Sequence, residues 1–130
     1  MDTLMSDLIL PDSMRATYDN FHFAPAQIRN GKLYASGQIG TDSAGSIPET
    51  AVDEFRNAWN SVGQILAEAN MDFSNIFEFT SYHVDLQQHI GSFMKVKDEF
   101  LKEPYPAWTA IGITELAIPG ARVEIRVQAA

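Results

Sequence analysis

Residues 30–37 read Asn-Gly-Lys-Leu-Tyr-Ala-Ser-Gly, and this stretch decides the fold. Asn30-Gly31 is the strongest short hairpin signal that a sequence offers, because both residue types tolerate the positive φ of a tight turn between strands. The turn predicts two antiparallel strands, over residues 22–28 and 32–36. The second of these strands ends at Ser36-Gly37, where the glycine is expected to relieve backbone strain.

Two amphipathic helices are predicted downstream of the hairpin, because apolar residues recur at steps of three and four. The first helix has Thr50 and Asp53 as a capping signal and Asn70 as a stop. The second begins near Asp85 and ends before Pro104. The apolar stripes consist of Ala51, Phe55, Ala58, Trp59, Val62, Ile65, Leu66 and Ala69 in the first helix, and of Ile90, Phe93, Val96 (or the stem of Lys97), Phe100 and Leu101 in the second.

Three more strands complete the pattern. Residues 75–84 are rich in Phe, Thr, Tyr and Val, residues 107–114 are mostly apolar, and Pro119-Gly120 turns the chain into a last strand over 122–129. In that strand alternate residues take opposite faces: Val123, Ile125 and Val127 on one, and Arg122, Glu124, Arg126 and Gln128 on the other.

The element order is therefore β-β-α-β-α-β-β, with a short leading strand possible at residues 8–10. This order predicts an α+β fold in which one mixed sheet carries both helices on one face, and a single domain over residues 1–130. The other face of such a sheet is bare, which favours self-association.

Composition excludes several functions. The 130 residues carry a net charge of −8 and contain no run of basic residues, so a nucleic-acid partner is not expected. The absence of cysteine excludes disulfides and zinc–thiolate sites. Asp2, Asp7 and Asp12 precede the first basic residue, Arg15, which is the reverse of a signal peptide, and no stretch is long enough to span a membrane. A cytoplasmic protein is expected.

Three motifs carry a resemblance to a known family: Leu33 to Gly40, Tyr105-Pro106-Ala107-Trp108, and Val123-Glu124-Ile125. Together with the element order they resemble the YjgF/RidA family, from about Phe21 to the end of the chain. The resemblance implies a chorismate-mutase-like fold and a homotrimer whose sheets close into a central barrel, with clefts between subunits. It also implies hydrolysis of small reactive enamines and imines.

The resemblance implies a set of site residues as well. Glu124 would position or activate the hydrolytic water, while Phe23, Ser36, Gly37, Met94, Ala107 and Trp108 would line the substrate cleft. Ser36 is interpreted as a hydrogen-bonding wall rather than a nucleophile, because the sequence indicates no base beside it. The alternative for Glu124 is a solvated ladder of ion pairs with Arg122 and Arg126.

Three positions depart from the catalytic pattern of the family. Trp108 stands where catalytic members have the arginine that holds the substrate carboxylate, Phe23 where they usually have tyrosine, and Met94 approximately where an asparagine is common. Each change makes the cleft more apolar, which favours an aromatic, aliphatic or cationic ligand over a small anionic imino acid. Arg15, Arg122 or Arg126 could replace the missing arginine, and nothing in the sequence selects one of them.

No cofactor is expected. His22, His83 and His89 lack the spacing of a helical metal pair, and each is interpreted as an ordinary polar or half-buried residue. Gly37 and Gly40 do not open a helix, so they do not form a phosphate-binding loop.

Two functions remain open. The first is an enamine or imine hydrolase with an apolar cleft and a water positioned by Glu124; the alternative is a non-catalytic trimeric module that binds a small ligand or another protein. An enzyme needs an open cleft that Glu124 reaches, whereas a binding or structural protein could have Trp108 filling that cleft.

Overall fold

The computed structural model describes residues 7–130, and residues 1–6 of the predicted domain, Asp2 among them, lie outside the described residues. The helices are α2 (Arg15–Phe21), α3 (Ala51–Glu68) and α4 (Leu86–Phe100), with short 3-10 turns at Asp12–Met14 and Phe73–Asn75. The strands are β1 (Leu8–Ile9), β2 (Ala26–Arg29), β3 (Lys32–Ala35), β4 (Ile76–Val84), β5 (Ala107–Ile113) and β6 (Val123–Ala129).

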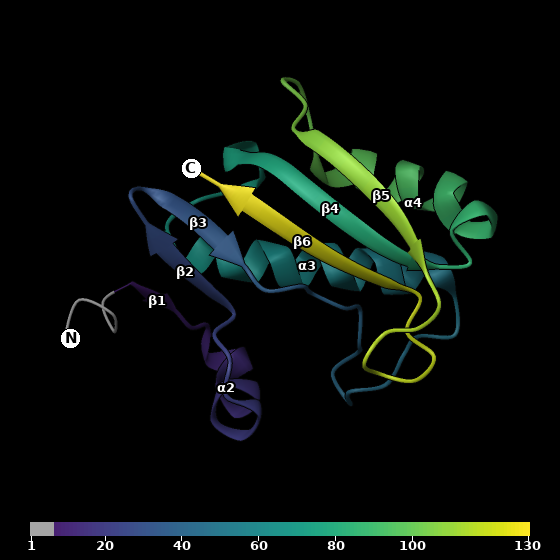
Figure 1. The fold of residues 1–130 in the computed structure, drawn as a ribbon, viewed down its shortest axis with the longest axis horizontal. Coiled ribbons are helices and arrows are strands. Elements are labelled where there is room, and N and C mark those ends of the chain that lie inside the picture. The colour runs from purple at the N-terminus through teal and green to yellow at the C-terminus, as the bar shows by residue number, and fades with distance from the viewer. Residues whose placement is uncertain (1–6) are drawn as a thin grey trace.

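All six strands form one sheet in the order β1-β2-β3-β6-β4-β5 (Figure 1). The β4–β5 pair is parallel and the other pairs are antiparallel, so the sheet is mixed, as predicted. The last strand of the chain, β6, lies between β3 and β4 in the middle of the sheet. A residue on β6 therefore has a neighbouring strand on each side.

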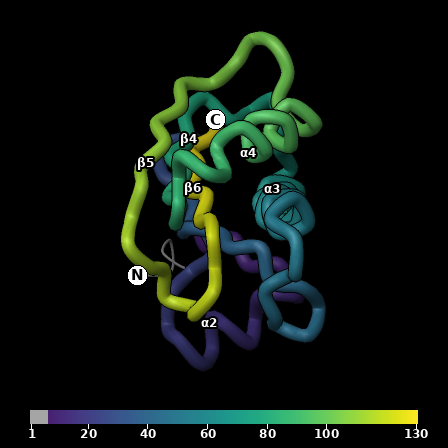
Figure 2. Tube along the Cα trace, turned by 90° about the vertical axis from the view of Figure 1, so that its right-hand side faces the viewer, coloured from purple at the N-terminus to yellow at the C-terminus, as the bar shows by residue number. Residues whose placement is uncertain are grey.

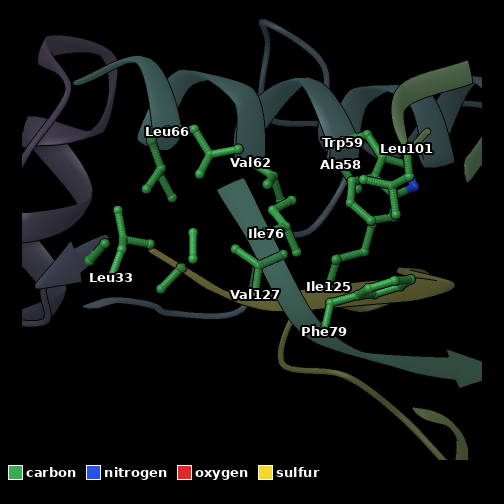
Figure 3. Close-up of a cluster of buried hydrophobic side chains, with 14 of the residues drawn as sticks. Leu33, Ala58, Trp59, Val62, Leu66, Ile76, Phe79, Leu101, Ile125 and Val127 are labelled. Carbon is green, nitrogen blue, oxygen red and sulfur yellow. The ribbon is translucent and has the colours of Figure 1, made fainter. Parts of the chain in front are cut away.

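Both long helices lie on the same face of the sheet, which confirms the predicted layers (Figure 2). The core fills the space between them, and Figure 3 shows α3 side chains above those of β4 and β6. Trp59 of α3 is fully buried; its ring packs edge-on against Phe79 and stacks on Phe100, with centroid separations of 5.2 and 6.1 Å. The capping signal is confirmed too, since the Thr50 hydroxyl accepts a hydrogen bond from the Asp53 amide at 3.2 Å.

The hairpin is confirmed, with one correction to its first strand. Asn30 and Gly31 have φ values of 52° and 76°, and they join β2 to β3 in a register that pairs Arg29 with Lys32. The first strand begins at Ala26 rather than at residue 22, because Pro25 has no N–H to donate to a neighbouring strand. The preceding residues form the helix α2, which was not predicted and which ends at His22 in a left-handed conformation.

Within the described residues 7–130, no helix covers the second face of the sheet. Side chains of β6 and β4 that point to this face include Glu124, Arg126 and Tyr82, whereas Val123, Ile125 and Val127 point to the helices and are buried. Ile111 and Tyr34, on neighbouring strands, are each 39% exposed on this face. This uncovered face is the one that the sequence predicts to favour self-association.

Candidate active site

Glu124 lies on β6 in the middle of the uncovered face, directly opposite Tyr82 of β4. Its side chain is half-buried, and this burial raises the pKa of the carboxyl group above its ordinary value. A carboxylate with a raised pKa is a better proton acceptor than an ordinary carboxylate. The predicted site residue is therefore one that can do acid–base chemistry.

Gly37 lies against Glu124 and makes room for it. A Cβ added to Gly37 would overlap the Glu124 carboxyl group, so no other residue fits without moving that side chain. The neighbouring Gln38 fixes this arrangement by exchanging two backbone hydrogen bonds with Ile125, at 2.8 and 2.9 Å. The close approach explains the glycine better than strain does, since its φ is not in the left-handed region.

Ser36 connects Gly37 to the segment that contains Phe23. The Ser36 hydroxyl donates to the Ala24 carbonyl at 2.7 Å, and the Ser36 amide donates to the Pro25 carbonyl at 2.8 Å. Phe23 itself is 47% exposed and lines a shallow hollow of about 450 Å³ together with Tyr18 and His22. The hydrogen bonds of Ser36 thus hold the segment next to Phe23, while the following residue, Gly37, contacts Glu124.

Trp108 lies on the opposite face of the sheet from Glu124. Its partner in the parallel β4–β5 register is Phe79, a core residue, and the two rings stack with centroids 5.6 Å apart and an interplanar angle of 9°. The indole Nε1–H donates to the hydroxyl of the buried Ser81 at 2.8 Å. The indole is therefore packed between the sheet and α4 and held there by a hydrogen bond.

The helix α4 places one charged group close to Trp108. The ammonium group of Lys97 is 5.3 Å from the centroid of the Trp108 ring, within the range of a cation–π contact. Met94, one turn earlier on the helix, is 46% exposed. Ala107 precedes Trp108 on β5, is exposed, and by alternation points to the uncovered face.

One protomer does not bring all the predicted site residues together. Glu124 with Gly37 stands in the middle of the uncovered face, while Trp108 with Lys97 stands at the β5 edge of the sheet on the helix side. A cleft that contains both groups therefore requires two copies of the chain. A larger hollow of about 750 Å³ between the start of α4 and residues 114–122 includes none of the predicted site residues.

Arg122 is not free to replace the missing arginine. Its guanidinium Nη1 lies 2.7 Å from Glu54 Oε1, and its backbone N–H donates to Glu54 Oε2 at 2.6 Å. Its two guanidinium nitrogens also donate to the carbonyls of Pro48 and Glu49. The prediction that Arg122 shares a polar face with Glu124 is wrong, because the residue precedes β6 and its side chain turns toward the buried carboxylate of α3.

The other two arginines are exposed. Arg126 shares the uncovered face with Glu124, one alternation away, and Arg15 begins α2. Arg126 does not lie beside Trp108 in the same protomer, since β6 is separated from β5 by β4.

His83 is fully buried, which corrects its interpretation as an ordinary polar or half-buried residue. Its Nε2 lies 2.7 Å from the Ser81 hydroxyl, and its Nδ1 has no hydrogen-bond partner. Burial, followed by the nearby charge of His89, lowers the pKa of His83 to about 4. The part-buried Trp108 and the buried Ser81 and His83 thus form one hydrogen-bonded row, in which the imidazole is neutral at physiological pH.

This row predicts a loss of stability in acid. The unfolded chain protonates His83 below a pKa of 6.5, whereas the folded protein does so only near 4, so the contribution of His83 is complete above pH 6.5 and falls as the pH drops toward 4. Between pH 7.5 and 4.5 we expect the free energy of unfolding to fall by about 2.5 kcal/mol through this residue. Urea unfolding of the native protein and of His83→Gln at both pH values measures the difference. The matched control His22→Gln, at an exposed histidine, should keep the native pH dependence, and a His83→Gln variant with that same dependence would contradict the assignment.

Within residues 7–130, no three His, Asp or Glu side chains are arranged to hold a metal ion. In the same part of the chain, no helix combines the length and the apolar character needed to cross a membrane.

Sequence reasoning missed Lys97 as a functional candidate, and it missed the pair Ser81 and His83. Lys97 was assigned to the apolar stripe of α4 through its stem only, and its closeness to Trp108 depends on the contact between α4 and β5. Alternation along β4 could have placed Ser81 and His83 on the same face as Phe79, which is the buried face.

Comparison with known proteins agrees with the fold and the motifs. The sequence profile of the family described as "Endoribonuclease L-PSP" matches residues 15–130. The "RutC family protein YjgH" of Escherichia coli strain K12 is 35% identical over 121 residues, which cover 92% of this chain and 90% of that protein. The goat (Capra hircus) "2-iminobutanoate/2-iminopropanoate deaminase" is 32% identical over 108 residues, covering 79% of this chain and 75% of the deaminase.

Solved structures give the same result. A structure described as "Protein YJGH" superimposes with a TM-score of 0.85 at 32% identity, covering 94% of this chain and 93% of its own. The structure of RidA from the Antarctic bacterium Psychrobacter sp. PAMC 21119 has a TM-score of 0.78 at 24% identity, covering 83% and 87%, and supports the fold. With the matched profile, the relatives and the three motifs in agreement, this chain belongs to the endoribonuclease L-PSP family, the family of YjgF and RidA proteins.

Proposed function

We propose that this protein hydrolyses enamines or imines of small metabolites in clefts between the subunits of a homotrimer. Relatives named 2-iminobutanoate/2-iminopropanoate deaminase, 29–33% identical to this chain, support the reaction class. Water adds to the carbon of the C=N bond, and ammonia leaves as a carbonyl group forms. The observation that carries the proposal is the half-buried Glu124, whose pKa is raised by burial and whose carboxyl group is cradled by Gly37.

Glu124 has a definite role in this reaction. As a carboxylate it accepts a proton from the attacking water, and as a carboxylic acid it returns that proton to the departing nitrogen. The segment at Ser36-Gly37 keeps the carboxyl group in place, and Tyr82 lies beside it on β4. In this proposal the half-buried carboxyl group of Glu124 provides the proton transfer that the reaction needs.

The separation of Glu124 from Trp108 supports a site between subunits. One copy would supply Phe23, Ser36, Gly37 and Glu124, and a neighbouring copy would supply the β5 edge with Ala107, Trp108, Met94 and Lys97. The uncovered sheet face of each copy is available for this assembly, since it exposes Tyr34 and Ile111.

The position of Trp108 favours catalysis over a filled, non-catalytic site. Its ring packs on Phe79 and its only donor binds Ser81, so the indole belongs to the wall of the protomer. A wall of this kind gives the cleft an apolar surface, which favours imines with a large apolar group over 2-iminopropanoate, the tautomer of 2-aminoacrylate.

The test measures ammonia release from 2-aminoacrylate and from 2-imino-3-phenylpropanoate, each generated in situ. We expect the native protein to prefer the phenyl substrate and Trp108→Arg to gain about tenfold or more on 2-aminoacrylate, because arginine grips a carboxylate with two donors. Trp108→Phe keeps an aromatic ring without a cation and should show no such gain. Equal rates on 2-aminoacrylate for the native protein and Trp108→Arg would show that this position does not set specificity, and a native protein that releases ammonia from neither substrate would refute the hydrolase.

A further inference from the structure

We propose that Lys97 supplies the cation of the ligand cleft, so that the substrate is an imine carrying one carboxylate beside an apolar or aromatic body. The inference rests on the proposed function and gives its site a substrate class. It differs from the sequence-based expectation of a cleft that disfavours small anionic imino acids, because it adds a cation beside the apolar surface.

The first step concerns what Trp108 is unable to do. An indole has a single donor, and the Nε1–H of Trp108 is used by the Ser81 hydroxyl at 2.8 Å. Its ring is stacked on Phe79 and tilted against Phe93, with centroids 5.6 and 5.9 Å away. The side chain therefore offers an apolar surface and no hydrogen bond to a ligand.

The second step is the placement of Lys97. Its ammonium group is 5.3 Å from the centroid of the Trp108 ring, and its side chain is only 14% exposed. The long apolar stem of Lys97 is thus packed against the protein, while its ammonium group lies close to the Trp108 ring. A lysine in the solvent would not be confined to this place.

The third step is that the ammonium group has donors to spare. Among residues 7–130, the carboxylate paired with it is that of Asp98, at 3.0 Å, whose side chain is 68% exposed. An ion pair with such an exposed carboxylate contributes at most about 1 kcal/mol, so a ligand carboxylate can replace it at little cost. An ammonium group has three N–H donors, which allows Asp98 and a ligand to share it.

Other basic side chains of α3, of α4 and of the segment just after α4 are engaged or lie elsewhere. Arg56 forms a two-pronged pair with Glu99 at 2.8 and 2.9 Å, and Lys102 donates to the Asp98 carbonyl. Lys95 lies on the exposed side of α4, two residues from Lys97. Among these side chains, the contact with Trp108 singles out Lys97.

The pair of groups defines the ligand chemistry. A compact ammonium ion binds a carboxylate as a point charge, without the two hydrogen bonds that arginine makes. It therefore holds the ligand carboxylate, while packing of the rest of the ligand sets its orientation. The Trp108 surface and the exposed Met94 provide that packing for an apolar or aromatic body. A short imino acid lacks the body, and a neutral imine lacks the charge.

The experiment compares a carboxylate with its neutral counterpart. Dissociation constants of phenylpyruvate and phenylpyruvamide are measured by titration calorimetry on the native protein, Lys97→Met and the matched control Lys95→Met. Loss of a charged hydrogen-bond partner should weaken phenylpyruvate binding about ten- to a hundredfold in Lys97→Met. Phenylpyruvamide binding should change less than twofold, and Lys95→Met should bind both compounds as the native protein does.

The same variants are then tested for ammonia release from 2-imino-3-phenylpropanoate and its amide. We expect kcat/KM for the carboxylate substrate to fall in parallel with binding, and to recover in part in Lys97→Arg. Equal phenylpyruvate affinity in the native protein and Lys97→Met, or an equal loss in Lys95→Met, would overturn the proposal. Because binding is measured without turnover, a native protein that binds phenylpyruvate through Lys97 but releases no ammonia would refute the hydrolase and leave the cation site established.

Discussion

Replacement of Glu124 by glutamine is expected to lower kcat for imine hydrolysis by about 100-fold or more, because general acid–base catalysis contributes roughly 10²–10⁴ to such a step. Glutamine keeps the size of the side chain and its place against Gly37 but accepts no proton from water. Steady-state ammonia release measures the loss. The variant should remain folded, since a carboxyl group that burial makes harder to ionise gains nothing in stability from its charge.

The pH profile distinguishes proton transfer from a structural effect. Burial raises the pKa of Glu124, and the water-activating form is the carboxylate, so kcat/KM of the native protein should rise with pH through that pKa and then level off. In Glu124→Gln this rise should disappear. The matched control is Glu78→Gln, at an exposed carboxylate on the same uncovered face, which should keep both the rate and the profile. An unchanged rate in Glu124→Gln would remove the main support for the hydrolase.

Replacement of Arg122 by alanine is expected to reduce the free energy of unfolding by about 3 kcal/mol, because removal of one partner of a buried ion pair leaves the other charge uncompensated. Glu54 is fully buried, and Arg122 provides both its guanidinium partner at 2.7 Å and a backbone N–H at 2.6 Å. Only the backbone donor survives the substitution. The carbonyls of Pro48 and Glu49 also lose their donors. Urea unfolding monitored by circular dichroism measures the change.

The Arg122→Ala experiment also tests whether this arginine binds substrate. At a temperature well below the unfolding transition, KM should stay close to the native value, since the guanidinium group is occupied by Glu54. Arg126→Ala is the matched control on stability, because Arg126 is exposed on the same strand and should change the free energy of unfolding by less than about 0.5 kcal/mol. A stable Arg122→Ala protein with a strongly raised KM would reverse the assignment.

Local periodicity accounts for the parts of the fold that the sequence predicts. The hairpin follows from Asn30-Gly31, the two long helices follow from stripes that recur every three or four residues, and the face of Glu124 follows from alternation along β6. Each of these signals involves residues close in sequence. Such local signals can be interpreted without knowing which helices and strands pack against one another.

The errors arise where local signals are weak or where distant residues meet. α2 has seven residues and buries none of them, so it leaves no apolar stripe to detect. Glu54 and Arg122 are 68 positions apart, and only the packing of α3 against the start of β6 makes them partners. An isolated arginine in a polar segment does not indicate that it forms a buried ion pair.

The face of the sheet to which Trp108 points could not be predicted from the sequence either. β5 reads Ala-Trp-Thr-Ala-Ile-Gly-Ile, with apolar residues on both faces, so alternation does not say which face is buried. The parallel pairing of Trp108 with Phe79 decides it. The closeness of Lys97 depends on the same pairing and on the contact between β5 and α4.

The hydrogen bond from Trp108 to Ser81 makes this position part of the core as well as of the predicted cleft. Here the indole also supports a buried hydroxyl and, through it, an imidazole that has no other partner. Replacement of Trp108 by arginine removes this donor, so the gain in activity on 2-aminoacrylate should come together with a less stable core around Ser81 and His83.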